Sequence, residues 1–157
     1  SLTLFFSTPG FDTPGLSGPS ENFKMAMKES FVLNLLGKEE EALIVTEKSL
    51  TGSRYPFDEA NFAKEAKIRL KQGINTSNAQ IAAVGASPNR ASSLQEINRP
   101  TLIIHGSEDP LIPVDHGIYL QQNIPNAKKL ILEGVGHEIP DQALSEIIPV
   151  MLNHFKL

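Results

Sequence analysis

Apolar and polar residues follow two kinds of pattern along this chain. Short apolar runs at 1–6, 101–104 and 129–132 are bounded by turn residues and are typical of strands. We expect the last two runs to be strands buried on both faces of a mostly parallel sheet. Between the first and second runs the pattern is mostly helical. A helical region of this size between strands of one sheet predicts a cap or lid.

The helical region predicts four helices. The first helix is expected between Ser20 and Gly37, the second from the acidic run 39–41 to Gly52, and the third between Asp58 and Gly73. The fourth is expected to begin at Thr76 or Ser77 and to end at Gly85 and Pro88. In the first helix, apolar residues recur every four positions at Phe23, Met27, Phe31 and Leu35. The resulting division is a core strand at 1–10, a helical cap or lid at 11–95, and the rest of the core at 96–157.

Two further helices are expected in the last part of the chain. Pro113 opens the first of them, and Pro140 suits the first turn of the second. The second carries one apolar stripe, which should pack on the sheet: Leu144, Ile147, Ile148, Met151, Leu152 and Phe155. Pro149 would kink this helix, and His154 is expected on its surface.

Composition limits the classes of protein that the chain can represent. Its 157 residues suffice for about one domain, and the formal net charge of −4 argues against nucleic-acid or membrane-surface binding. The absence of cysteine excludes disulfides, a thiol nucleophile and cysteine metal sites, and it suits a reducing compartment such as the cytoplasm. No signal-peptide or membrane-spanning pattern is present, although a targeting segment upstream of Ser1 stays open.

Candidate chemistry follows the second and third apolar runs directly. One run leads into His105-Gly106-Ser107-Glu108-Asp109-Pro110-Leu111-Ile112-Pro113, and the other into Gly134-Val135-Gly136-His137. Because the carboxyl ends of parallel strands meet at one edge of a sheet, Asp109 and His137 are expected to lie together. A histidine can accept a proton near pH 7, and a carboxylate can hold its ring in the required tautomer.

Together these motifs resemble the last third of an α/β-hydrolase. The family's acid motif, H-G-x-x-D-x-x-x-P, is matched by His105, Gly106, Asp109 and Pro113, and its histidine motif, G-x-G-H, ends here at His137. The resemblance covers residues 99–155 well and implies the catalytic acid Asp109 and the catalytic base His137. It also implies the fold class: an α/β protein, the C-terminal part of an α/β-hydrolase, with a helical cap insertion.

The family's nucleophile motif, G-x-S-x-G, has no match. The nearest segments, 15–19 and 85–89, end in Pro19 and Asn89 where the second glycine belongs. We therefore expect the nucleophile and the oxyanion-binding amides to lie before Ser1, in an N-terminal half that this chain requires as its partner. The chain alone is then expected to be inactive. Its unpaired sheet edge also predicts association, including homo-oligomers.

The resemblance implies that the complete protein hydrolyses a small-molecule carboxylic ester by a Ser-His-Asp triad, as cap-bearing, lipase-like esterases and methylesterases do. An aspartate nucleophile would instead imply a haloalkane dehalogenase or epoxide hydrolase. C–C bond hydrolases and haloperoxidases share the acid and the histidine, and a non-catalytic ligand-binding member is a further alternative.

Other residues have simpler interpretations beside their functional ones. Asp109 could belong to an ordinary Asp-Pro turn, and Glu108 is its rival as the acid. His105, His116 and Asp109 match no strong metal-binding spacing, so neither a metal nor a cofactor is expected. Met25, Met27 and Phe31 are candidates for contacting an apolar substrate, although the pattern favours the simpler interpretation that they form the core of the first helix.

Overall fold

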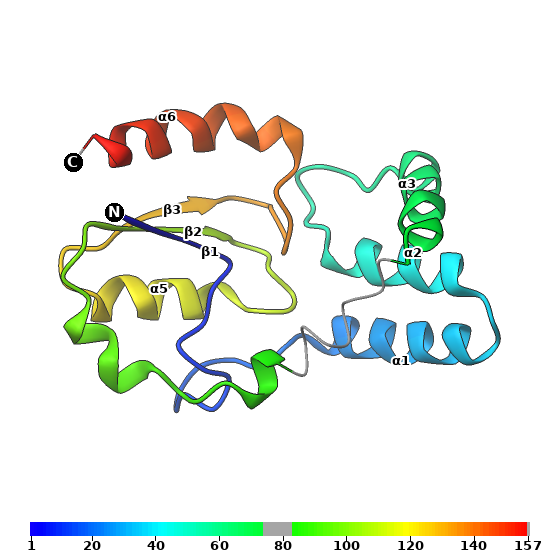
Figure 1. The fold of residues 1–157 in the computed structure, drawn as a ribbon, viewed down its shortest axis with the longest axis horizontal. Helices are drawn as coiled ribbons and strands as arrows, with labels where there is room; N and C mark the ends of the chain where they lie inside the picture. The colour runs from blue at the N-terminus through cyan, green and yellow to red at the C-terminus, as the bar shows by residue number, and fades with distance from the viewer. Residues whose placement is uncertain (74–82, 157) are drawn as a thin grey trace.

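The computed structural model describes residues 1–73 and 83–156, and its centre is a three-stranded parallel sheet (Figure 1). The strand order is β1 (Leu2–Phe5), β2 (Thr101–Gly106) and β3 (Lys128–Leu132). All six residues of β2 are buried, as its unbroken apolar run predicted. Parallel pairing places the carboxyl ends of the three strands at the same edge of the sheet.

Helices cover both faces of this sheet (Figure 1). Leu102 and Ile104 point to one face, where Ile147 of α6 (Leu144–Phe155) packs against them. Ile103 points to the other face and packs with Leu120 of α5 (Val114–Asn123). The alternation of β2 side chains thus joins two hydrophobic clusters through one strand. The short 3-10 helix η1 (Ala91–Glu96) adds buried Leu94, which lies within the range predicted to be the cap, to the cluster on the α5 side.

The region predicted to be a cap contains α1 (Glu21–Leu35), α2 (Glu39–Leu50) and α3 (Glu59–Lys71), and these helices lie beyond the carboxyl ends of the strands (Figure 1). These are the first three predicted helices, and the N-caps expected for the first and third are confirmed. Ser20 Oγ accepts the amide of Phe23 at 3.2 Å, and Asp58 Oδ1 accepts that of Asn61 at 3.0 Å. The fourth predicted helix begins outside the described residues, and residues 83–86 near its expected end are helical.

Two predictions about burial are wrong. Strand β3 begins with the exposed residues Lys128 and Lys129, because in the described sheet it is an edge strand. In α6, most of the predicted apolar stripe is exposed: Leu144, Ile148, Leu152 and Phe155. Only Ile147 of this stripe is buried. A three-stranded sheet is too narrow to cover a helical face of this width.

The last helix also differs in detail from the prediction. The segment after Pro140 is a 3-10 turn, η2 (Asp141–Ala143), and α6 then continues through Pro149. His154, expected on the surface, is buried, and its Nε2–H donates to the carbonyl of Leu2 at 3.0 Å. None of the described helices is long and apolar enough to cross a membrane.

Candidate active site

The structure brings Asp109 and His137 together at the carboxyl edge of the sheet. The loop after β2 carries the acid and the loop after β3 carries the histidine, whose Nδ1–H donates to Asp109 Oδ2 at 2.7 Å. The carboxylate is fully buried, whereas 24% of the imidazole is exposed. One ring nitrogen therefore has a fixed partner, and the other, Nε2, is directed away from the carboxylate.

The turn around Asp109 determines how its two oxygens are used. Oδ1 accepts the backbone amides of Leu111 at 2.9 Å and Ile112 at 2.7 Å, which is an Asx-type turn. Oδ2 is left for the histidines. Burial by itself would raise the pKa of Asp109, but the hydrogen bonds from His105, His137 and the Ile112 amide outweigh it and hold this pKa below its ordinary value. Asp109 is therefore ionised at neutral pH.

His105 stabilises the same turn through its side chain. It is fully buried, and its Nε2–H donates to the carbonyl of Ile112 at 2.7 Å while lying 3.3 Å from Asp109 Oδ2. Because a carbonyl oxygen can only accept, this contact assigns the proton to Nε2. His105 thus acts as a structural residue, in agreement with its expected place at the end of a strand.

Backbone contacts join the acid loop to the histidine loop. The amide of Ser107 donates to the carbonyl of Leu132 and that of Glu108 to Val135, both at 3.0 Å. Gly134 has a positive φ of 69°, which an L side chain would strain. A Cβ at Gly106 would overlap the carbonyl oxygens of Val135 and Gly136. The glycines of the two motifs therefore allow the turn and the close approach that hold the pair in place.

The arrangement can perform base catalysis. With Nδ1–H donated to a buried carboxylate, the lone pair of His137 lies on Nε2, where it can take a proton from a hydroxyl. Within residues 1–73 and 83–156, no hydroxyl group is hydrogen-bonded to this nitrogen. A nucleophile for His137 is therefore not provided by the described residues in this conformation.

Sequence reasoning missed Phe6 at this site. Phe6 follows β1 with a positive φ of 43°, and its ring centroid lies 5.3 Å from that of His137 and 5.7 Å from that of His105. Its ring thus forms an apolar wall beside both histidines. The available signal was its position at the end of the first strand, at the same sheet edge as the two motifs.

The remaining candidates lie elsewhere. Glu108, the rival acid, is exposed and binds Ser53 instead of His137. Met25 and Phe31 of α1 are 59% and 63% exposed, and Met27 is partly buried. Their proposed contact with substrate stays a prediction.

His116 has both ring nitrogens occupied within the protein. Its Nδ1 accepts the hydroxyl of Thr8 and its Nε2–H donates to the carbonyl of Ser17, each at 2.8 Å. These bonds tie the start of α5 to the connector between β1 and the cap. Across the described part of the chain, no group of three or more acidic, histidine or cysteine side chains is placed to hold a metal ion.

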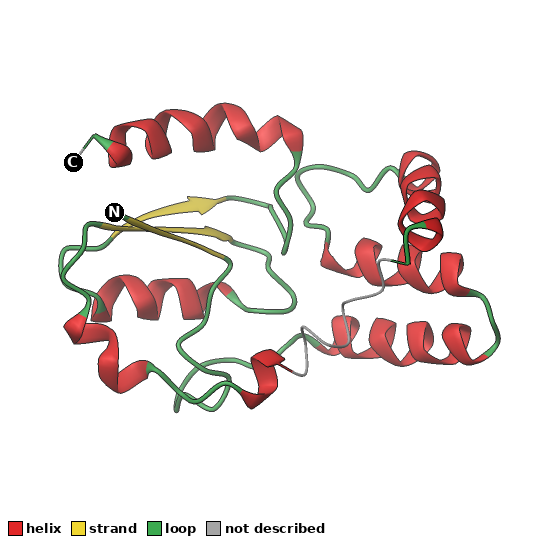
Figure 2. Cartoon of the chain, in the orientation of Figure 1, coloured by secondary structure: helices red, strands yellow, loops and turns green. Residues whose placement is uncertain are grey.

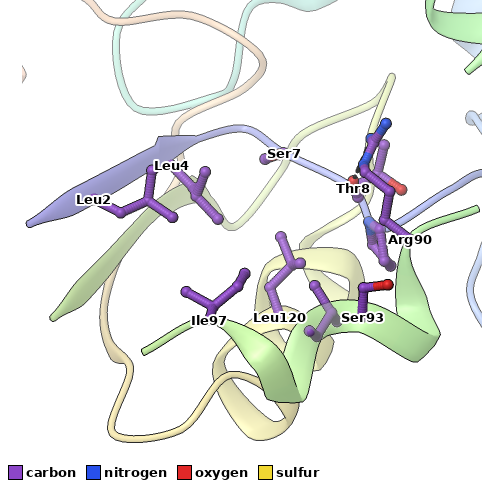
Figure 3. Close-up of a pocket in the computed structure, with 10 residues that line it drawn as sticks. Leu2, Leu4, Ser7, Thr8, Arg90, Ser93, Ile97 and Leu120 are labelled. Atoms are coloured by element: carbon purple, nitrogen blue, oxygen red, sulfur yellow. Dashed lines mark hydrogen bonds between the residues drawn. The ribbon is translucent and has the colours of Figure 1, made fainter. Parts of the chain in front are cut away.

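A separate cavity of about 280 Å³ lies beside β1, on the α5 side of the sheet (Figure 3). Leu2 and Leu4 of β1 lie opposite Ile97 and Leu120, and Thr8 and Arg90 lie at one end. Asp109 and His137 do not line this cavity. It is therefore distinct from the acid–histidine pair.

Comparison with solved structures gives the same fold. An esterase from Exiguobacterium antarcticum superposes with a TM-score of 0.68 at 15% identity, covering 99% of this chain and 57% of the esterase. At this level of identity the similarity establishes the fold alone.

Two curated relatives add sequence similarity. Rhodomycin D methylesterase DauP of Streptomyces sp. (strain C5) is 27% identical over 131 residues, which are 80% of this chain and 43% of the relative. A 2-hydroxy-6-oxononadienedioate/2-hydroxy-6-oxononatrienedioate hydrolase of Pseudomonas putida is 40% identical over 50 residues, or 32% of this chain and 18% of the relative. The chain spans less than half the length of the curated relatives that it matches.

A family model matches a stretch that includes the predicted cap region, the acid motif and the histidine motif. It covers residues 16–144, which are most of the chain, and it describes the alpha/beta hydrolase fold. The three-stranded parallel sheet between α5 and α6 agrees with this assignment. The chain therefore belongs to the alpha/beta hydrolase fold family.

Proposed function

We propose that this chain supplies the general base, His137, and its carboxylate partner, Asp109, to an ester hydrolase. The observation that carries the proposal is the 2.7 Å hydrogen bond from His137 Nδ1 to a buried, ionised Asp109, which leaves Nε2 as the basic nitrogen. The proposed nucleophile is a serine from a segment outside this chain.

In the proposed reaction, His137 Nε2 takes the proton of the serine hydroxyl as its oxygen attacks the ester carbonyl. Asp109 stabilises the imidazolium that forms, without itself becoming protonated. The imidazolium then returns the proton to the departing alcohol, and a water molecule repeats the sequence on the acyl-enzyme. The ester class is supported by similarity to a methylesterase over 80% of the chain.

Hydrolysis of a C–C bond is a second candidate. It is supported by the 40% identity over 50 residues to the Pseudomonas putida hydrolase named for oxononadienedioate substrates. The two candidates use the same histidine and acid, so only substrate assays separate them. The complete protein would be assayed with a p-nitrophenyl ester and with a 2-hydroxy-6-oxo-dienoate, and faster turnover of the ester supports our proposal.

The test of the mechanism is fluorophosphonate labelling of the endogenous protein, detected with an antibody raised against this chain. We expect a labelled band heavier than 17.1 kDa, the mass of the chain. The recombinant 157-residue chain should neither be labelled nor hydrolyse a p-nitrophenyl ester. A heavier band without label would contradict a serine nucleophile and favour an aspartate or a binding role. Ester hydrolysis by the recombinant chain that His137→Ala abolishes would contradict an external nucleophile.

A further inference from the structure

A segment of the cap lies directly against the histidine loop. Residues 50–54, here called the cap strap, leave the end of α2 and pass beside the loop between β3 and α6 (Figure 2). The backbone amide of His137 donates to the carbonyl of Leu50 at 2.8 Å, and the amide of Arg54 donates to the carbonyl of Gly134 at 2.8 Å. The cap strap therefore binds the histidine loop on both sides of Gly136.

The two backbones are packed without side chains between them. A Cβ at Gly136 would overlap the carbonyl oxygen of Leu50, and a Cβ at Gly52 would overlap the carbonyl oxygen of Gly134. Contact of this kind requires glycine on both segments. A displacement of the cap strap would consequently move the residue that precedes His137.

Two carboxylates hold the cap strap, and each is a sequence neighbour of one member of the acid–histidine pair. Glu138 accepts the amide of Gly52 at 3.2 Å and the hydroxyl of Thr51 at 3.3 Å. Glu108 accepts both the amide and the hydroxyl of Ser53 at 2.7 Å. The bonds from Ser53 hold the pKa of Glu108 below its ordinary value, so its ionised form makes this contact at neutral pH.

We infer that the cap strap positions His137, and that Glu108 and Glu138 are positioning residues that act through it. The inference rests on the proposed function, because it assigns these residues to the placement of the proposed base. Asp109 fixes the ring of His137, whereas the cap strap fixes its backbone through the Leu50 carbonyl. The predicted cap region thus contributes to the geometry of the base through the cap strap.

The experiment is NMR spectroscopy of the complete protein and of its double variant Glu108→Gln/Glu138→Gln. Two-bond ¹H–¹⁵N spectra report the tautomer of His137, and hydrogen exchange reports its amide. In the unmodified protein we expect the Nδ1–H tautomer and a protected amide. In the double variant we expect a mixture of tautomers and about tenfold faster exchange at His137 and Ser53, with Ile103 in the sheet unchanged.

Glu133→Gln is the control, because Glu133 is an exposed acid on the same histidine loop and the variant makes the same Glu-to-Gln change, with the loss of one negative charge where the double variant loses two. It should change neither signal. An unchanged tautomer and amide in the double variant would overturn the inference. If exchange at Ile103 also accelerates, the double variant has disturbed the sheet, and Ser53→Ala replaces it because this variant removes only a hydroxyl donor. A mixture of His137 tautomers and faster amide exchange in Ser53→Ala would support the inference, and unchanged signals would overturn it.

The inference and the proposed function can fail separately. The double variant could lose the Nδ1–H tautomer of His137 while the complete unmodified protein hydrolyses no ester. This result would contradict the proposed reaction and still support the inference that the cap strap positions His137. In an active complete protein, the double variant should lower kcat with little change in KM. An equal kcat would overturn the positioning role while leaving the reaction in place.

Discussion

Clear sequence signals predict both the acid loop after β2 and the helix α1. The contacts in the structure fix the side chains of the acid loop more tightly than those of α1. Both carboxylate oxygens of Asp109 are hydrogen-bonded, and its side chain is fully buried. In α1, by contrast, apolar side chains such as Phe31 and Leu35 are 63% and 72% exposed. The acid loop has one defined geometry, whereas α1 has an apolar surface that the described residues leave uncovered.

The difference follows from the kind of contact that orders each region. The acid loop is fixed by directional hydrogen bonds to backbone groups on neighbouring segments, and these tolerate little displacement. Helix α1 packs mainly on α2, where the hydroxyl of Ser30 donates to the carbonyl of Ala42, while the apolar residues of α1 are spread around more than one face. Helical periodicity predicts such a helix without predicting what covers it.

The largest expected effect is that of Asp109→Asn in the complete protein. The amide cannot hold His137 in the Nδ1–H tautomer as a carboxylate does, so kcat should fall by about 10⁴-fold. Steady-state kinetics measure this change, and an unchanged circular dichroism spectrum shows that the fold is intact. Glu133→Gln should keep full activity. A loss of less than tenfold for Asp109→Asn would contradict the assignment of the catalytic acid.

A substitution in the sheet should lower the free energy of unfolding more than a substitution at an exposed position of α1. Ile103→Ala removes a fully buried side chain from β2 and should lower the free energy of unfolding by about 3 kcal/mol. Leu35→Ala, at an exposed position of α1, should change it by less than about 0.5 kcal/mol. Urea unfolding of the complete protein measures both values. A comparable loss at Leu35 would show that α1 buries this residue against a surface in solution.

Features of this molecule that depend on local sequence signals were predicted better than those that depend on long-range contacts. The caps Ser20 and Asp58, the buried strand β2 and the acid and histidine motifs all depend on residues close together in the sequence. Each is decided by a few neighbouring side chains. The positions of these elements were therefore predictable from single stretches of the chain.

The errors and omissions arise where distant segments meet. His154 is buried because it reaches the carbonyl of Leu2, and nothing in its own helix indicates that contact. The bond from Ser53 to Glu108 likewise joins a cap loop to the acid loop across 55 positions of sequence. The position of Phe6 beside His137 depends on the pairing of β1 with β2. Such contacts require the tertiary arrangement, which periodicity and caps do not contain.

The smallest expected effects concern the three α1 residues proposed to contact substrate. The amide of Ser20 donates to the carbonyl of Pro110 at 2.8 Å, so the start of α1 lies next to the acid loop. Met27 is partly buried one turn after Phe23, whereas Met25 and Phe31 are mostly exposed, so we predict that Met27 contributes more than the other two to binding an apolar substrate. In the complete protein, Met27→Ala should raise KM for a long-chain ester by about tenfold. Met25→Ala and Phe31→Ala should leave KM unchanged. Equal increases for all three variants would contradict this ranking and would mean that the exposed face of α1 closes over the substrate.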